Sequence, residues 1–162
     1  MNTSKVLFND TPVNEFEDFP FTLRAFLEKP TFLPTLSGLD NLKLLSKVDL
    51  ETRDEEIVKA LEIVGLIEEK DKLFRKYSLG MKQKLGIACA IMDNPDVIIL
   101  DEPFNGIDFE SANRIRDYIK QQSKNDKIFI ISTHIRDDLE QLCDEIFSMQ
   151  EGVLSAIDKD SL

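Results

Sequence analysis

The sequence is poor in the residues that build covalent or metal-bound scaffolds. It has two cysteines, one histidine and no tryptophan among 162 residues. With so few thiols and imidazoles, neither a disulfide framework nor a Cys/His metal cluster is expected. No apolar stretch approaches the roughly 20 residues that a membrane-spanning helix needs. No apolar segment follows Met1–Lys5 either, so a secretion signal is not expected.

Positive charge is also scarce. The chain carries 20 basic and 31 acidic residues, a formal net charge of −11. Proteins that bind a nucleic-acid duplex usually present a basic face, so this balance argues against nucleic acid as the main partner. Cys89 and Cys143 are expected to be reduced thiols of a cytoplasmic protein. The length fits one globular domain with a substantial core.

The second half of the chain alternates between two patterns. Apolar, β-branched runs predict strands at 97–100, 128–131 and 146–149. Helical patterns lie between them, at 110–123 and 135–142. Strands that alternate with helices predict a parallel α/β sheet with right-handed crossovers, and the first two strands are expected to be covered on both faces. Further strands are predicted at 5–8, 23–27 and 153–157.

The stretch from Leu39 to Met92 has helical spacing and interrupts this α/β pattern. Asp54 is expected to cap one of its helices and Gly65 to end that helix. We therefore assign residues 1–30 and 94–162 to an α/β core and residues 31–93 to an inserted helical subdomain.

Two adjacent carboxylates follow the apolar run at 97–100. Asp101 and Glu102 are expected at the carboxyl end of a buried strand, where open α/β sheets bind ligands. One carboxylate there can hold Mg²⁺, directly or through water, and the next can polarise an attacking water. The alternative is a solvated strand end, because Asp and Glu are common at such positions. The four apolar residues before the pair and Pro103 after it favour the functional interpretation.

Two further positions have a functional and a structural interpretation. Ser78 is a good helix N-cap, Gly80 permits close approach of a ligand to the backbone, and a helix N-terminus suits a phosphate. A plain helix cap explains the same residues. His134 follows the apolar run at 128–131 and is expected at the same sheet edge as the two carboxylates, where it can orient a water or contact a phosphate. A lone histidine at a strand end is more often structural.

Taken together in this order, the three motifs resemble the nucleotide-binding domain of an ABC transporter. Residues 77–81 (Tyr-Ser-Leu-Gly-Met) stand where that family has its Leu-Ser-Gly-Gly-Gln signature, with Ser78 and Gly80 retained. The resemblance implies that Asp101 is the Walker B aspartate, Glu102 the catalytic glutamate and His134 the switch histidine. The implied fold is a P-loop NTPase-like parallel sheet core, incomplete here, with an inserted ABC-type α-helical subdomain.

Two more family positions are recognisable. Residues 105–108 (Asn-Gly-Ile-Asp) resemble the D-loop, which implies that Asp108 helps to bind nucleotide. Glu28 stands where the family usually has the Q-loop glutamine. A glutamate keeps an oxygen ligand for Mg²⁺ or water, loses the amide donor and adds a negative charge, and we treat it as a variant of that motif. The stretch from Glu28 to Leu45 looks most like exporters for bacitracin or lantibiotic-type peptides.

The family's main nucleotide cradle is missing from the sequence. A P-loop has the pattern Gly-x-x-x-x-Gly-Lys followed by Ser or Thr, and none of the six glycines begins it. The resemblance places this loop upstream of Met1, so the chain is expected to be truncated at its N-terminus. Without the loop and its lysine, the residues that serve the nucleotide have little to act on, and the chain alone is expected to be inactive.

The leading interpretation is therefore an ATP-binding and ATP-hydrolysing subunit of an ABC transporter, with ATP and Mg²⁺ as substrate and cofactor. Its expected partners are an integral-membrane permease, which residues 31–93 would contact, and a second ABC ATPase domain in a homo- or heterodimer. Its expected place is the cytoplasmic face of the membrane. One alternative is a non-catalytic partner that supplies Ser78 and Gly80 in trans to an intact ATPase domain. Another is an ABC ATPase that acts on DNA or ribosomes, which the acidic balance disfavours.

Overall fold

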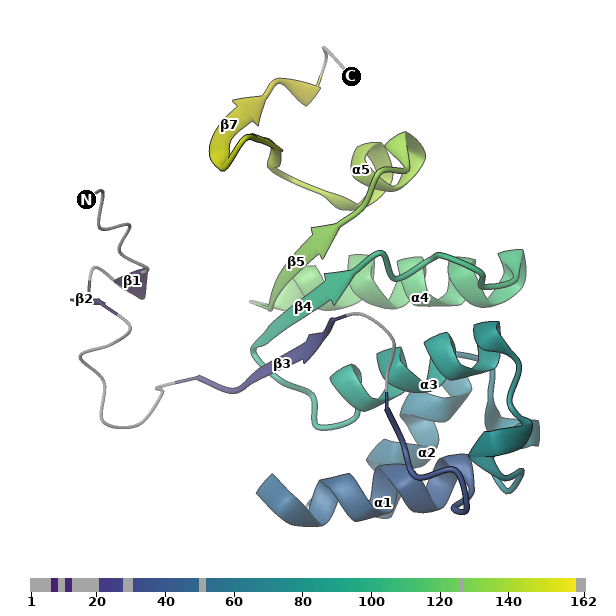
Figure 1. Cartoon of the computed structure of the whole chain (residues 1–162). Coiled ribbons are helices and arrows are strands. Elements are labelled where there is room, and N and C mark those ends of the chain that lie inside the picture. Colours follow the sequence, from purple (N-terminus) through teal and green to yellow (C-terminus); the bar gives the residue numbers. More distant parts are fainter. Residues whose placement is uncertain are drawn as a thin grey trace.

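The structure is a computed structural model that describes residues 7–8, 11–12, 21–27, 31–49, 52–125 and 127–159. Its helices are α1 (Gly38–Asp49), α2 (Asp54–Ile63), α3 (Leu79–Ile91), α4 (Phe109–Gln122) and α5 (Arg136–Leu142), with 3-10 helices at Ile67–Glu69, Phe74–Lys76 and Ser123–Asn125. Its strands are β1 (Leu7–Phe8), β2 (Thr11–Pro12), β3 (Leu23–Phe26), β4 (Val97–Asp101), β5 (Ile128–Ser132), β6 (Ile146–Gln150) and β7 (Val153–Ile157) (Figure 1).

A three-stranded parallel sheet in the order β3-β4-β5 carries the centre of the fold. In its register, Val97 lies between Leu23 and Ile128, and the carboxyl edge pairs Asp101 with Ser132. Parallel strands require crossover connections. Helices α1 to α3 lie between β3 and β4 in the chain, and α4 lies between β4 and β5. The predicted α/β class and the helical stretch within it are therefore confirmed.

One face of this sheet packs against helices α3 and α4 (Figure 1). Ile98 and Leu100 on β4 are fully buried in the core. Phe129 on β5 meets Tyr118 of α4 edge-on, with ring centroids 6.4 Å apart. Burial raises the pKa of Tyr118 to about 12, because the neutral phenol tolerates an apolar environment better than the phenolate does.

The opposite face of the sheet is largely open. Side chains alternate along a strand, and Leu23, Ile128 and Ile130 on this face are 43%, 52% and 52% exposed. β4 is mostly buried, as expected for the middle strand. The prediction that the strand at 128–131 is covered on both faces is therefore wrong. An apolar β-branched run identifies a strand, but it does not reveal whether a second layer lies over it.

In the helical region, the end of α2 agrees with the sequence-based expectation and its N-cap does not. Gly65 has φ +68° and follows the end of α2, as predicted. Asp54 is the first residue of that helix and not its cap: the cap position is Arg53, whose N–H donates to the Glu56 carboxylate at 3.2 Å. The Asp54 carboxylate instead accepts a hydrogen bond from Lys43 at 2.5 Å, so a contact with α1 replaces the predicted capping role.

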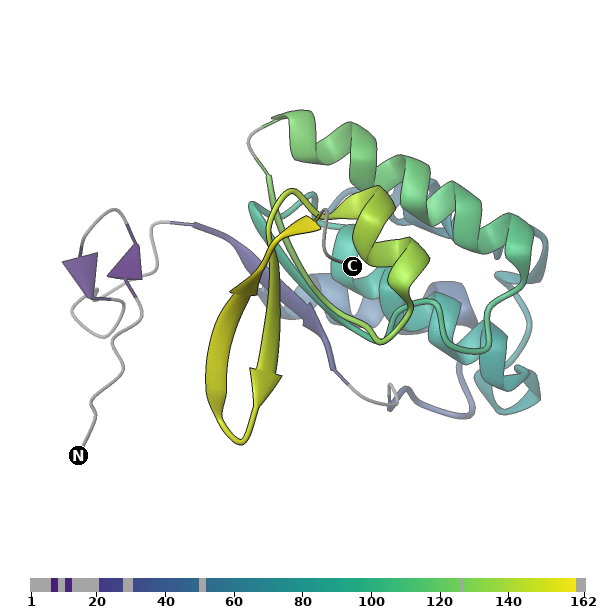
Figure 2. The ribbon, with the colours of Figure 1, turned by 90° about the horizontal axis from the view of Figure 1, so that it is seen from above.

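The strands β6 and β7 form an antiparallel hairpin of their own. The sequence predicts the strand at 146–149 as a member of the parallel sheet, and this prediction is wrong. The cause lies in the turn: Glu151 and Gly152 have φ +49° and +80°, the left-handed pair that closes a two-residue hairpin. In Figure 2 the hairpin, in yellow, is seen as a two-stranded ribbon.

Part of the predicted strand at 5–8 is described, and Leu7–Phe8 pairs antiparallel with Thr11–Pro12. The strands predicted at 23–27 and 153–157 are confirmed by β3 and β7. Among the described residues, no helix combines the length and the apolar character that crossing a membrane requires.

Candidate functional site

The carboxyl end of β4 places the two predicted carboxylates. Asp101 is the last residue of the strand, and Glu102 follows it in the left-handed region with φ +44°. A non-glycine residue is strained there and keeps that conformation only where its surroundings hold it. The Glu102 N–H donates to the carbonyl of Ser132 at 2.8 Å, which extends the sheet pairing by one residue beyond the strand.

Glu102 and His134 are in contact, as the shared sheet edge predicts. The Nδ1 atom of His134 lies 2.8 Å from Oε1 of Glu102, and Asn105 donates its side-chain amide to Oε2 at 3.3 Å. The imidazole is largely exposed, whereas the carboxylate is about two-thirds buried. This arrangement fixes the carboxylate by hydrogen bonds on both oxygens and leaves the histidine open to a ligand. A carboxylate held in this way can orient or activate a water.

Asp101 is suited to a hard divalent cation. Its carboxylate is half-buried at the carboxyl edge and has no hydrogen-bond partner among the described residues. The described residues contain no group of three His, Cys, Asp or Glu side chains that would hold a metal unaided. Mg²⁺ in phosphate-transfer sites commonly takes one or two carboxylates together with water and substrate phosphates. One free carboxylate therefore fits a nucleotide-bound Mg²⁺. Glu28, the other predicted ligand, lies outside the described residues.

Ser78 caps helix α3, as predicted. Its hydroxyl oxygen accepts a hydrogen bond from the N–H of Met81 at 3.2 Å, and the serine itself is exposed. Leu79 beside it is 64% exposed. Behind them Tyr77 is buried and donates its hydroxyl to the carbonyl of Glu69 at 2.8 Å. The first turn of α3 therefore faces outward from an anchored base.

Gly80 lies against the loop that follows β4. A Cβ atom at this position would come within 2.4 Å of the Gly106 carbonyl oxygen, so no larger residue fits without a shift of backbone. The sequence analysis interprets Gly80 as a position that lets a ligand approach the backbone closely. The structure shows that the close approach here is made by this chain's own loop.

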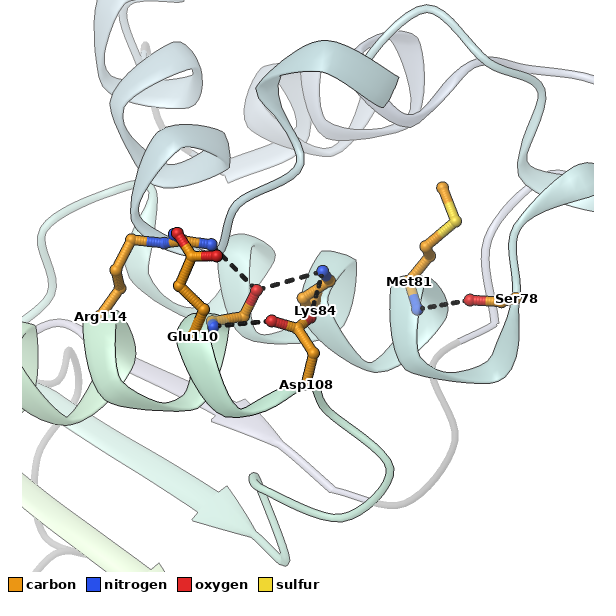
Figure 3. A network of polar contacts seen from close by, with 7 residues as sticks. Ser78, Met81, Lys84, Asp108, Glu110 and Arg114 are labelled. Atoms are coloured by element: carbon orange, nitrogen blue, oxygen red, sulfur yellow. Dashed lines mark hydrogen bonds and ion pairs between the residues drawn. The ribbon is translucent and has the colours of Figure 1, made fainter.

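Asp108 is tied to α3 by a buried lysine (Figure 3). The Lys84 ammonium donates to Oδ2 of Asp108 at 2.9 Å and to the hydroxyl of Ser111 at 3.2 Å. Asp108 also caps α4, accepting the Ser111 N–H at 2.9 Å. That backbone hydrogen bond and the one from Lys84 hold the pKa of the Asp108 carboxyl well below its usual range. The carboxylate is half-exposed, so it remains available to a partner.

Two neighbours extend this network on α4. Arg114 donates to the hydroxyl of Ser111 at 3.0 Å and to the Glu110 carboxylate at 2.7 Å. A Cβ at Gly65 would stand 2.0 Å from the Arg114 guanidinium, so this glycine also makes room for a side chain. The end of α2 and the start of α4 are thereby fitted together.

The structure thus brings the predicted residues into two groups. Asp101, Glu102 and His134 share the carboxyl edge, and Ser78, Gly80 and Asp108 lie around the start of α3 and the loop beside it. The side-chain amide of Gln83 donates to the main-chain carbonyl of Glu102 at 3.0 Å and joins the groups. Sequence reasoning missed Gln83 and Lys84. The one available signal was a lysine directly before the buried run at 85–88.

The family follows from the comparison with known proteins. The model of the family described as ABC transporter matches residues 2–105. This chain belongs to the ABC transporter family. The match takes in β3, the helices α1 to α3 and the Asp101–Glu102 pair, so the family resemblance predicted from the motifs is confirmed.

Two curated relatives of this ABC family chain are transport ATP-binding proteins. The chain is 44% identical over 131 residues to the bacitracin transport ATP-binding protein BcrA of Enterococcus faecalis, covering 80% of this chain and 42% of the relative. It is 34% identical over 128 residues to the lantibiotic transport ATP-binding protein SrtF of Streptococcus pyogenes, covering 79% and 56%. The chain therefore spans about half the length of these relatives.

Solved structures agree on the ABC fold. The ATP-binding subunit of an ABC transporter superposes with a TM-score of 0.74 at 24% identity, covering 85% of this chain and 60% of the other. A dimeric ATP-binding cassette in a post-hydrolysis state, bound to ADP and Pi, gives a TM-score of 0.76 at 19% identity, covering 94% and 72%. At these identities the two structures establish the fold alone.

Proposed function

We propose that this chain forms the hydrolytic and signature parts of an ATP site in the ATP-binding subunit of an ABC transporter. The contact between Glu102 and His134, beside the free Asp101 carboxylate, is the observation that carries the proposal. In this role Glu102 orients or activates the water that attacks the γ-phosphate, and His134 contacts that phosphate or the water. Asp101 holds the Mg²⁺ that accompanies ATP, directly or through water.

The second group, Ser78, Gly80 and Asp108, is proposed to contact a nucleotide that is bound to another domain. Ser78, Gly80 and Asp108 lie at the outward-facing first turn of α3 and the loop packed on it, with the Ser78 hydroxyl and the half-exposed Asp108 carboxylate at the surface. We infer that a second ABC ATPase domain docks here. The backbone N–H groups and the positive end of the α3 dipole then meet the phosphates of the partner's ATP.

The transport role rests on the named relatives. Because BcrA and SrtF are bacitracin and lantibiotic transport proteins, we propose export of a peptide antibiotic of that type as the process that ATP hydrolysis drives. The partner is then an integral-membrane permease at the cytoplasmic face of the membrane. Within the subunit, residues 31–93 act as the helical subdomain that meets the permease, and residues 1–30 and 94–162 form the α/β core.

The phosphate-binding loop has to come from sequence outside these 162 residues, because none of the six glycines begins that pattern. The lysine and backbone cradle of such a loop hold the β- and γ-phosphates in ATPases of this kind. We therefore expect no ATP turnover by this chain alone. Glu28 is proposed to contact the Mg²⁺ or its water in place of the usual glutamine.

The proposal is tested by complementation. This chain is mixed with a polypeptide from an ABC relative that carries the phosphate-binding loop, the strand before it and the helix after it, and phosphate release from Mg-ATP is measured. We expect turnover from the mixture and none from either component. A complex that binds ATP tightly but never releases phosphate would contradict the hydrolytic role.

A second candidate function has its own supporting observation. Ser78 is exposed and caps α3, so the chain can offer Ser78 to an intact ATPase domain without binding ATP itself. Added to an intact ABC ATPase domain, the chain is then expected to raise ATP turnover. The Ser78→Ala form should not raise it, whereas Ser123→Ala, which alters an exposed serine after α4, should act as the wild type does. Equal effects of the two variants would exclude this function.

A further inference from the structure

The geometry points to Gln83 as a positioning residue for the Glu102–His134 pair. Gln83 lies in the first half of α3, is half-buried, and donates its side-chain amide to the Glu102 carbonyl at 3.0 Å across 19 residues of sequence. No part of Gln83 touches the carboxylate or the imidazole in the described contacts. Its action is therefore on the backbone that aims the Glu102 side chain. The catalytic consequence rests on the proposed function, but the positioning itself does not.

The backbone at Glu102 needs such support. Its φ of +44° is a strained conformation for a residue with a side chain, and it determines the direction in which that side chain leaves the chain. The N–H of Glu102 is held by Ser132 at 2.8 Å, on the β5 side. The carbonyl is held by Gln83 at 3.0 Å and by the N–H of Asn105 at 3.3 Å. Gln83 is the only one of these three partners that comes from α3.

The same helix carries the signature residues, so the contact has a second consequence. One turn before Gln83, Gly80 lies against the Gly106 carbonyl, and one residue after it Lys84 bonds Asp108. The start of α3 and the loop after β4 therefore meet at three points. Of these, the Gln83 contact is the one that reaches the peptide of Glu102. A shift of the first turn of α3 is thereby passed to the carboxylate that meets His134.

The test uses the full chain and a spectroscopic signal that is unique in it. His134 is the only histidine, so its ring nitrogens give a single set of ¹⁵N signals. The hydrogen bond from Nδ1 to Glu102 sets the position of one of them. Spectra at one fixed neutral pH are compared for the wild type, Gln83→Met and Glu102→Ala. Methionine keeps the length and helix preference of glutamine and removes the donor.

We expect the Nδ1 signal of Gln83→Met to move from the wild-type position toward that of Glu102→Ala. The matched control is Gln121→Met, which makes the same change at an exposed position near the end of α4. Its Nδ1 signal should stay at the wild-type position. A folded Gln83→Met chain with an unchanged Nδ1 signal would overturn the proposal.

A third variant guards against misfolding. Gln83→Lys restores a donor of similar reach, so its Nδ1 signal should return to the wild-type position. If Gln83→Met unfolds, this variant decides: a lysine form with the Glu102→Ala signal would overturn the proposal. In the complementation assay, Gln83→Met should lower kcat with little change in KM for ATP. Because the NMR result needs no ATP turnover, a failed proposed function and a failed positioning role remain distinguishable.

Discussion

The two faces of the β3–β4–β5 sheet are made of similar residues and meet different surroundings. On one face Ile98 and Leu100 are completely buried under α3 and α4. On the other, Ile128 and Ile130 of the neighbouring strand leave about half of their surface in water. The free energy that this sheet contributes to folding therefore comes mainly from one face. The candidate site lies at the carboxyl edge, where both faces end, and is held by contacts from α3.

The largest expected effect comes from the ion pair that joins α5 to α4. Arg116 bonds Asp138 at 2.7 Å, and Asp138 is 1% exposed, so Arg116→Met leaves a buried carboxylate unpaired. The loss should be about 3–5 kcal/mol in the free energy of unfolding. Equilibrium urea denaturation measures it. Arg136→Met removes an exposed pair with Glu140 and should cost only about 0.5 kcal/mol, so equal losses would contradict this account.

A matched pair of substitutions tests the comparison of the faces directly. Ile98→Ala removes a buried side chain and should lower the free energy of unfolding by about 2–4 kcal/mol. Ile130→Ala makes the same change one strand away, on the open face, and should cost less than about 1 kcal/mol. Urea denaturation of both variants gives the difference. Similar costs would show that the open face is covered in solution.

A smaller effect is expected at the edge that holds the site. Lys84→Met removes the ammonium that bonds Asp108 and Ser111, and we expect a loss of about 1 kcal/mol because Asp108 is half-exposed. Lys124→Met, at an exposed position after α4, is the control and should leave the free energy of unfolding unchanged. Thermal denaturation is sufficient to separate them. An unchanged Lys84→Met chain would mean that the tie adds no stability.

The last prediction concerns pH. Burial raises the pKa of Tyr118 from 10.0 to about 12, so folding favours the neutral phenol. The stability from this group is fully present below pH 10 and is lost as the pH rises from 10 to 12. Tyr118→Phe should therefore flatten the fall of stability in that window. Burial also raises the pKa of Tyr77 to about 12 and that of Cys89 to about 11, so these two groups should contribute to the remaining slope. An unchanged slope in the Tyr118→Phe chain would contradict this account.

The sequence predicts much of the site because local rules govern its parts. Ser78 as a cap, and Glu102 with His134 at one sheet edge, follow from strand order and capping chemistry alone. The open face was not predictable, because an apolar strand such as the one that contains Ile128 and Ile130 has the same sequence pattern whether or not a layer covers it. The role of Gly80 and the ties of Gln83 and Lys84 depend on how α3 meets a distant loop, which no local pattern encodes.

The central claim is that Glu102, held by its contact with His134, orients or activates the water that attacks ATP. The most direct measurement is the rate of phosphate release in the complemented complex for Glu102→Gln against the matched Glu110→Gln, which alters an exposed carboxylate on α4. The account predicts a loss of about 100-fold or more for Glu102→Gln, with ATP still bound, and wild-type turnover for Glu110→Gln. Equal rates in the two variants would contradict it.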